Sequence, residues 1–200
     1  MDQLQILKLF PETVLKYKVD NYKKFNEELS KYIYKLYEDD NIGVKKSNKG
    51  GWHSQNFKLN EKDSIQYRFT LELSKYIGNA FKNFGWKIEN KNIRVTEMWG
   101  IINKKNDFNV LHTHPNCYLS AAYYVKTNKK CGNFEVESPN IARRHSYPEL
   151  AVQNELNLNI ASIDISDGDL LLFPSYLPHK VGINESEEDR IVISFNVDAK

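Results

Sequence analysis

The stretch FNVLHTHPNCYLSAAYYVK at residues 108–126, followed by GDLLLFPSYLPHKV at 168–181, decides the fold class of this chain. Both stretches hold short apolar runs bounded by proline, glycine or asparagine, which is typical of β-strands joined by turns. His112 and His114 stand two residues apart, so the alternation of a strand turns both imidazoles to one face. We therefore expect β-structure that displays histidines on one surface.

The strand pattern continues on both sides of these stretches. From Trp86 to the C-terminus the hydrophobic period is two, and turn residues separate the predicted strands. They are IRVTEMWGII (93–102), FNVLHTH (108–114), YLSAAYYVK (118–126), GNFEVES (132–138), SIDI (162–165), DLLLFP (169–174), HKVGI (179–183) and RIVISFNVDA (190–199). The segment 139–159 shows no clear period.

Two helices are predicted upstream of the strands. Apolar residues recur at three- and four-residue intervals over residues 22–37, behind Asn21 as a favourable N-cap. They recur every four residues over 61–84, and Gly85 follows as a stop. Helices first and strands afterwards indicate an α+β chain that is mainly β, with the helices buttressing one sheet.

The other segments are predicted to be less regular. Residues 5–19 are predicted as strand material with an edge or a bulge at Pro11. Residues 41–54 are predicted as a flexible, basic loop that closes on Trp52. The later part of this loop and the segment 139–159 are the two candidates for a lid over a site.

Composition and charge narrow the class of protein. The chain has 200 residues, of which 40% are hydrophobic and 27% charged, a balance typical of one globular domain. The net charge of +2 supplies no strong field for nucleic acid. The two cysteines, Cys117 and Cys131, are too few for a disulfide scaffold. We find no signal-peptide pattern and no stretch near the ~18 apolar residues of a membrane span.

We therefore expect a single cytoplasmic domain over residues 1–200. Residues 1–90 would hold the N-terminal strand and the two helices, and residues 91–200 a two-sheet jelly roll, that is, a cupin-like double-stranded β-helix. The strand near the N-terminus would lie at a sheet edge, where it could pair with a second copy. A homodimer is thus also predicted.

Three histidines form a candidate transition-metal site. His112 and His114 share a face, and His179 begins a later strand that in a jelly roll can return beside the first. Imidazole binds iron, zinc, copper and nickel alike, so the pattern predicts a metal without naming it. His114 could instead stand beside the metal or face the substrate. His53 and His145 fall in predicted loops, where we expect ordinary packing or surface residues.

The last strand carries a candidate anion anchor. Arg190 shares one face with Val192, Ser194 and Asn196, so a polar row points inward. A guanidinium matches a carboxylate in bidentate geometry. The alternative is a surface ion pair with the acidic residues that directly precede Arg190.

A tyrosine could assist that anchor. Tyr124 shares its face of the strand with Ser120 and Ala122, and these small neighbours leave room beside a phenol that can donate to the same carboxylate. The alternative is an ordinary strand aromatic.

Five stretches together resemble the Fe(II)- and 2-oxoglutarate-dependent oxygenase superfamily, and more closely its branch of short oxygenases encoded by phages and bacteria. They are GGWHS, NVLHTHPNCYLSAAYYV, GNFEVESP, GDLLLFPSYLPHKV and RIVISFNV, and they span most of the chain from residue 50 onward. Their order, spacing and strand context agree as a set, whereas HTH alone is a weak signal. The resemblance implies a distorted double-stranded β-helix that holds iron at one open end.

The resemblance also implies roles for individual residues. His112 stands at the first iron ligand and His179 at the distal one. Arg190 stands at the basic residue that binds the far carboxylate of 2-oxoglutarate, and Tyr124 at a tyrosine that assists it in prolyl hydroxylases. The further residues of that pocket would be Ser194 and Asn196.

One position departs from the family pattern. His114 stands where most members have Asp or Glu, which together with two histidines would hold the iron. The chain would then have a three-histidine iron site, or water would take the third position while His114 stands aside. The activity implied is hydroxylation, in which O2 and the decarboxylation of 2-oxoglutarate drive the oxidation of a substrate C–H bond.

Two other readings compete with this one. A cupin-type metalloenzyme would bind its substrate directly on the metal without 2-oxoglutarate, and GDLLLFPSYLPH followed by Asn184 also looks like a cupin motif. Cupins usually place a glutamate about four residues after the paired histidines, whereas residues 118–120 are Tyr, Leu and Ser. A non-catalytic jelly-roll binding module is the third reading, since fold alone does not imply activity. The pattern names no primary substrate.

Overall fold

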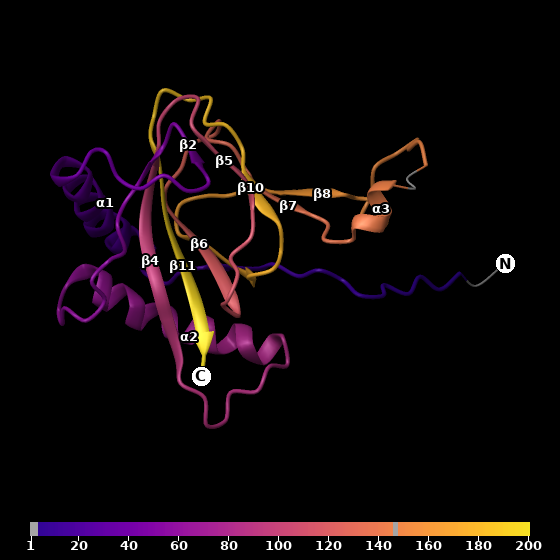
Figure 1. The fold of residues 1–200 in the computed structure, drawn as a ribbon, viewed down its shortest axis with the longest axis horizontal. Helices are drawn as coiled ribbons and strands as arrows, with labels where there is room; N and C mark the ends of the chain where they lie inside the picture. The colour runs from indigo at the N-terminus through magenta and orange to yellow at the C-terminus, as the bar shows by residue number, and fades with distance from the viewer. Residues whose placement is uncertain (1–3, 146–147) are drawn as a thin grey trace.

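The computed structural model describes residues 4–145 and 148–200, apart from the side chains of residues 143 and 144 (Figure 1). Its helices are α1 (Tyr22–Asp39), α2 (Ile65–Asn83) and α3 (Ile141–His145). Its strands are β1 (Leu15–Lys18), β2 (Asn48–Lys49), β3 (Trp52–His53), β4 (Ile93–Asn103), β5 (Phe108–His112), β6 (Leu119–Lys126), β7 (Phe134–Glu137), β8 (Ile160–Ile163), β9 (Asp169–Pro174), β10 (His179–Val181) and β11 (Arg190–Ala199).

The strands form two antiparallel sheets that pack face to face. The larger sheet has the order β1-β9-β6-β11-β4-β3, and the smaller one has the order β2-β5-β10-β7-β8. A buried cluster joins their inner faces, in which Trp99 and Val192 of the larger sheet meet Phe134 and Val136 of the smaller one. This arrangement confirms the predicted mainly β, jelly-roll fold.

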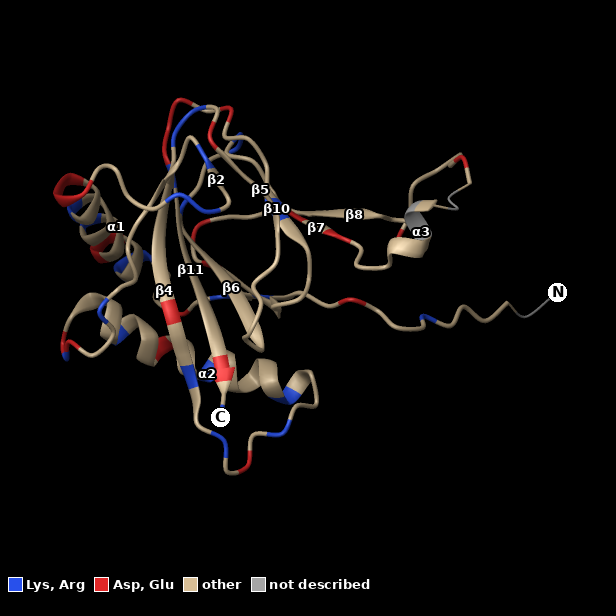
Figure 2. Ribbon diagram, viewed as in Figure 1, with Lys and Arg blue, Asp and Glu red and all other residues tan. Residues whose placement is uncertain are grey.

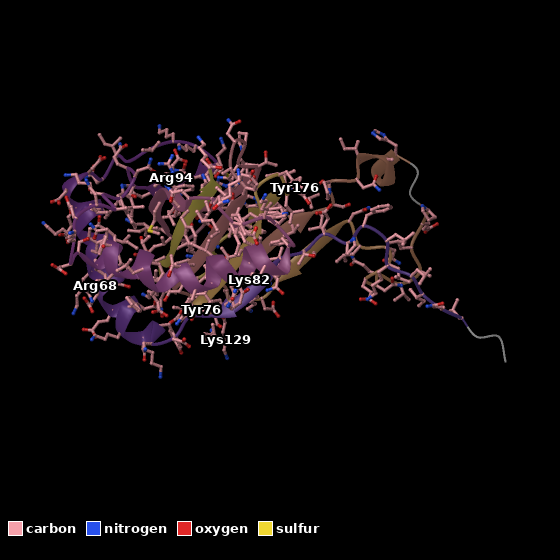
Figure 3. All side chains as sticks on the ribbon, turned by 90° about the horizontal axis from the view of Figure 1, so that it is seen from below. Arg68, Tyr76, Lys82, Arg94, Lys129 and Tyr176 are labelled. Atoms are coloured by element: carbon pink, nitrogen blue, oxygen red, sulfur yellow. The ribbon has the colours of Figure 1, made fainter. Side chains whose placement is uncertain are left out.

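The two long helices cover the outer face of the larger sheet (Figure 1). Phe69, Leu73, Ile77 and Phe81 recur every four residues on α2 and are all buried. Ser64 caps this helix, because its hydroxyl accepts a hydrogen bond from the Tyr67 amide at 3.3 Å. Figure 3 views the molecule from below and shows α2 crossing the strands. The predicted buttressing of one sheet by two helices is confirmed.

Burial on both faces explains the composition of the central strands. β6 and β11 are almost wholly buried, because one face of each strand packs under the helices and the other faces the smaller sheet. Tyr123 and Ile193 point to the helices, whereas Tyr124 and Val192 point to the space between the sheets. Their near-continuous apolar runs follow from this position.

The predicted strand over residues 5–19 is wrong for most of its length. Only Leu15–Lys18 pairs, with β9, and the preceding residues run outward on the same side as β8 and α3 (Figure 1). Phe10 has a left-handed φ of 57° directly before Pro11, so the chain cannot continue a strand there. Lys8 pairs with Glu155 at 2.8 Å, which links this segment to the loop before β8.

The predicted flexible loop at 41–54 is also more ordered than expected. It contains β2 and β3, and Trp52 is buried with its indole nitrogen donating to the Asp40 carbonyl at 2.7 Å. Gly50 allows the connection, since its φ is 80° and a Cβ there would lie 1.9 Å from Oδ1 of Asp107. Two-residue strands are too short to show a period, which is why the pattern missed them.

Smaller corrections concern three other places. Asn21 precedes α1 as predicted, but it is left-handed and its side chain makes no capping hydrogen bond. β8 begins two residues before the predicted SIDI strand, and α3 lies inside the segment predicted to have no period.

Charges of both signs are mixed over the helices and loops (Figure 2). Among the described residues, no helix is both long and apolar enough to cross a membrane.

Candidate metal centre and co-substrate cavity

Four rows of side chains line the inner face of the larger sheet. Strand register places residues of β4, β11 and β6 side by side in each row. The rows are Asn103–Arg190, Ile101–Val192–Tyr124, Trp99–Ser194–Ala122 and Glu97–Asn196–Ser120. We name them the Arg190, Tyr124, Trp99 and Glu97 rows. Neighbouring rows lie about 7 Å apart, because each step spans two strand residues.

A cavity of about 540 Å³ lies between the sheets over these rows. It reaches from Arg190 and Asn103 at one end to Glu97 and Asn196 at the other. Its size falls within the ~300–1,000 Å³ of typical ligand pockets. The cavity can therefore hold more than one small diacid.

The three predicted histidines converge on the wall opposite the rows. β5 and β10 are neighbours, and His179 stands opposite His112 in their register. One ring nitrogen from each of His112, His114 and His179 lies within 4.8 Å of the others. The ring centroids of His112 and His179 are 4.3 Å apart. The geometry therefore fits a single metal ion held by three imidazoles.

Backbone carbonyls orient two of these imidazoles. Nδ1 of His112 lies 2.7 Å from the Val110 carbonyl, and Nδ1 of His179 lies 2.9 Å from the Leu177 carbonyl. A carbonyl only accepts hydrogen bonds, so Nδ1 carries the proton in both rings. The Nε2 lone pairs are left free, and this is the usual way in which a neighbouring group fixes a histidine ligand.

His114 is held by ring contacts instead. Its ring stacks on His179 with centroids 5.2 Å apart and on Trp99 at 5.8 Å. Burial lowers the pKa of His114 to about 4 and that of His179 to about 3, and repulsion from His112 adds to both shifts. Burial also lowers the pKa of His112. All three rings are therefore neutral near pH 7 and keep a lone pair for a metal.

Arg190 is fully buried at the closed end of the cavity. Its Nη1 donates to the carbonyls of Cys131, Gly132 and Gly182, the last at 3.1 Å. Its Nε and Nη2 have no partner. The surface ion pair considered from the sequence is therefore not formed.

Tyr124 adds a further unsatisfied donor in the next row. Its side chain is fully buried and its hydroxyl has no partner. Burial raises the pKa of Tyr124, so the phenol stays protonated and can donate. Leaving a buried donor unmet costs about 1–3 kcal/mol. The Tyr124 hydroxyl and the free nitrogens of Arg190 thus present hydrogen-bond donors to the same end of the cavity.

Ser194 and Asn196 also line the cavity, as predicted, but further from Arg190. The amide of Asn196 is already engaged, because its oxygen accepts from Ser120 at 3.0 Å and its nitrogen donates to Glu97 at 3.1 Å. The predicted contact of Ser194 and Asn196 with the co-substrate stays a prediction.

Several cavity residues were not predicted from the sequence. Asn103 and Trp99 are buried, and the Asn103 amide nitrogen and the Trp99 indole nitrogen have no partner. Both share a face of β4 with Glu97, so counting by two along this strand would have found all three. His53, expected to be an ordinary loop residue, lies on β3 and stacks on Trp99 with centroids 5.3 Å apart.

The two lid candidates lie differently with respect to the cavity. Lys46, Ser47 and His53 of the first candidate line it. The described part of the segment 139–159 contributes no residue to the cavity wall. Only the first candidate therefore stays a predicted lid.

Comparisons with known proteins show which family this chain resembles. A family model described as "Putative 2OG-Fe(II) oxygenase" matches residues 97–196, which is half of the chain and includes the three histidines, Arg190 and Tyr124. A search of the curated proteins finds no similar sequence.

Solved structures of low sequence identity share the fold. A prolyl-4-hydroxylase of Pseudomonas putida is 10% identical with a TM-score of 0.66, over 94% of this chain and 92% of that chain. HygX of Streptomyces hygroscopicus, crystallised with nickel, 2-oxoglutarate and hygromycin B, is 14% identical with a TM-score of 0.65, over 94% and 83%. SnoN, a non-haem α-ketoglutarate-dependent epimerase of nogalamycin biosynthesis, is 12% identical with a TM-score of 0.67, over 94% and 76%.

The sequence match spans the strands that build the cavity, and the fold is shared with enzymes of the same chemistry. The chain therefore belongs to the family of 2OG-Fe(II) oxygenases, oxidoreductases that use non-haem iron, 2-oxoglutarate and O2.

Proposed function

We propose that this chain is a hydroxylase in which His112, His114 and His179 hold the iron, while Arg190 and Tyr124 bind the far carboxylate of 2-oxoglutarate. The observation that carries the proposal is the set of buried donors without acceptors at the closed end of the cavity. The branch of short oxygenases encoded by phages and bacteria stays our prediction within the family.

The residues present fit an iron ion. Three neutral nitrogen donors lie within 4.8 Å of one another. Carbonyl hydrogen bonds fix two of the rings, and stacking on Trp99 and His179 fixes the third. We propose that His114 ligates the metal itself, because one of its ring nitrogens lies within 4.8 Å of a ring nitrogen of each of the other two histidines. Iron bound there would let O2 serve as the oxidant: one oxygen atom would convert 2-oxoglutarate to succinate and CO2, and the other would enter a substrate C–H bond as a hydroxyl.

Three neutral ligands alter the charge of the site. The usual Asp or Glu would bring a negative charge beside the anionic keto-acid end of 2-oxoglutarate, and His114 brings none. A site with three histidines therefore repels the keto-acid end of 2-oxoglutarate less than a site with two histidines and one carboxylate does. Arg190 still supplies the positive charge at the other end.

The residues around Arg190 fit a carboxylate. Three carbonyl contacts hold Nη1 and leave Nε and Nη2 to point two parallel N–H groups at one acceptor. The Tyr124 hydroxyl supplies a further donor in the neighbouring row. A cupin-type enzyme that binds substrate directly on the metal would have no use for a buried cation with free donors. This site therefore favours the 2-oxoglutarate reading.

Apolar residues around the metal site exclude water. Phe134 and Phe173 pack on His179 with ring centroids 5.3 and 4.6 Å away. Ile101 and Val192 form the middle of the cavity floor. This lining strengthens the electrostatic contacts of Arg190 and shields the reacting groups.

An anaerobic titration tests the proposal. Adding 2-oxoglutarate to the Fe(II)-loaded protein should produce a visible metal-to-ligand charge-transfer band that saturates at one equivalent per chain. In the presence of O2 the same sample should slowly release succinate without any added substrate. A protein that binds Fe(II) but shows neither the band nor succinate would contradict the proposal.

Other expectations stay predictions. The free edge of β1 could pair with a second copy, and sedimentation analysis at several concentrations would show a dimer. Cys117 and Cys131 are both free thiols, which fits the cytoplasmic setting that we expect. One domain over residues 1–200 is likewise expected.

A further inference from the structure

The side chains of the Glu97 row form a chain of hydrogen bonds in which each donor points toward Glu97. Ser120 Oγ donates to Oδ1 of Asn196 at 3.0 Å, and Nδ2 of Asn196 donates to Oε2 of Glu97 at 3.1 Å. Both hydrogen bonds run toward the carboxylate. The row therefore ends in a fixed, half-buried carboxylate whose other oxygen is free to accept.

This carboxylate lies on the far side of the metal site from Arg190. The Trp99 row contacts His114, and the Glu97 row is the next one along the sheet, about 7 Å further from Arg190. 2-Oxoglutarate would fill the space between Arg190 and the histidines. The Glu97 end of the cavity is therefore left for the primary substrate.

Glu97 forms no ion pair in the described part of the chain, although Lys46 also lines the cavity. Glu97 is the only acidic residue that lines the cavity, and no ion pair to it is formed within residues 4–145 and 148–200. Lys46, the other charged residue toward the histidine end of the cavity, places its ammonium 5.7 Å from the centre of the Trp99 ring. An anchored carboxylate without an ion-pair partner favours a cation from outside.

A second feature of this end also indicates a polar ligand. The Trp99 side chain is 5% exposed, lines the cavity and carries an indole N–H without a partner. Its N–H can donate to a polar substituent of a ligand in the cavity. The two features lie one row apart on β4.

We propose that Glu97 anchors a basic nitrogen of the primary substrate, an ammonium or a guanidinium, and thereby presents a neighbouring carbon of the substrate to the metal site. The substrate class is a small amine or the side chain of a basic residue in a peptide. The inference rests on the proposed function, because it takes the 2-oxoglutarate end of the cavity as occupied.

Binding of matched probes tests the inference without turnover. The sample is the protein loaded with Mn(II) and 2-oxoglutarate, and the readout is the paramagnetic relaxation of probe protons, with a Zn(II)-loaded sample as the diamagnetic reference. One pair of probes is pentylamine and 1-pentanol, which represent a free small molecule. The other pair is Nα-acetyl-lysine amide and Nα-acetyl-norleucine amide, which represent a peptide side chain.

We expect the amine of at least one pair to bind about tenfold or more tightly than its neutral partner, since a charge-assisted hydrogen bond is worth about that factor. The pair that shows the preference identifies the source of the amine. Equal binding within both pairs, or binding of no probe, overturns the inference.

Two variants locate the preference at Glu97. E97Q keeps the size of the side chain and an acceptor for Asn196, so the preference for the amine should fall to about onefold while 2-oxoglutarate binding stays. E89Q removes a glutamate that is exposed and lies outside the cavity, and it should leave the preference intact. An unchanged preference in E97Q contradicts the inference. Failure of the wild type to bind 2-oxoglutarate overturns the proposed function, and the inference with it.

Discussion

Arg190 on β11 and Asn103 on β4 stand directly opposite each other, and both side chains are buried with nitrogen atoms that have no partner. Two neighbouring strands thus present unmet donors to the same end of the cavity. A carboxylate bound there would satisfy both, and Asn103 would be a further contact to 2-oxoglutarate beside Arg190 and Tyr124.

Replacing Asn103 tests this pairing. N103D puts a carboxylate where the co-substrate carboxylate should bind, and repulsion should weaken 2-oxoglutarate binding by about tenfold or more. N103A removes only the donor and should have a smaller effect. Calorimetric titration of the Mn(II)-loaded variants measures both. Equal affinity of N103D and the wild type would place the carboxylate elsewhere.

Gly132 should be needed for the orientation of Arg190. Its φ is 79°, and a Cβ there would lie 2.3 Å from the Gly182 carbonyl oxygen, which accepts from Arg190. We expect G132A to weaken 2-oxoglutarate binding while Mn(II) binding is kept. G85A is the matched control, because Gly85 has a φ of 66° with nothing within 4 Å of a Cβ. G85A should lose about 1–2 kcal/mol of unfolding free energy through backbone strain, and G132A should lose more, because its Cβ also meets backbone atoms of residues 182 and 183.

A selective loss in G132A alone would support the role of Gly132 in holding Arg190. If both variants bind 2-oxoglutarate as the wild type does, the carbonyl contacts do not position Arg190.

Position 114 should tolerate a carboxylate but not a methyl group. H114D restores the usual ligand set of two histidines and one carboxylate, so it should keep the metal. H114A leaves two ligands and should lower the affinity for Co(II) by about tenfold or more, as followed by absorption spectroscopy. Metal affinity in H114A equal to that of the wild type would show that His114 stands beside the metal.

Asp169 should make the fold sensitive to acid. Its carboxylate is buried and lies 3.0 Å from the Lys16 ammonium and 2.5 Å from that of Lys18, which ties β1 to β9. Burial alone would raise its pKa, but hydrogen bonds from Lys18 and Lys16 outweigh burial and hold the pKa below the ordinary value of 3.8. A depressed folded pKa stabilises the fold above pH 3.8, and this stability is lost as the pH falls through the folded value.

Urea unfolding at pH 7 and near pH 3 measures this contribution. D169N should lower the unfolding free energy at pH 7 by about 1–3 kcal/mol, because it removes the negative charge that pairs with Lys16 and Lys18. The difference between D169N and the wild type should shrink at the lower pH. A difference that does not change with pH would contradict the assignment to Asp169.

The β core was predictable because strand alternation and histidine spacing are local signals. The inward face of β11 was found by counting by two from Arg190, and the structure places the unmet donors of Arg190 and Tyr124 at one end of the cavity. Asn103, Trp99 and Glu97 follow the same alternation on β4 but become significant only through strand register, which pairs them with β11. Register depends on contacts between distant segments, which a single sequence does not reveal.

The least predictable parts of the chain are the segments that have no hydrophobic period in their sequence. β2 and β3 have two residues each, and their order comes from pairing with β5 and β4. The apolar residues of 5–10 suggested the start of a strand, yet Leu9 and Phe10 are largely exposed because no neighbouring strand pairs with them. Hydrophobicity alone cannot distinguish an apolar segment that pairs with a neighbouring strand from one that pairs with none.

The central claim is that Arg190 receives the far carboxylate of a diacid whose keto-acid end binds at the three histidines. Its most direct test compares 2-oxoglutarate with 2-oxopentanoate, which lacks that carboxylate, in the anaerobic Fe(II)-loaded wild type and in R190M. The wild type should bind 2-oxoglutarate at least about thirtyfold more tightly, since two or more charge-assisted hydrogen bonds are at stake, and R190M should bind both compounds nearly equally. A wild type that does not discriminate, or an R190M that discriminates as well as the wild type, would contradict the account.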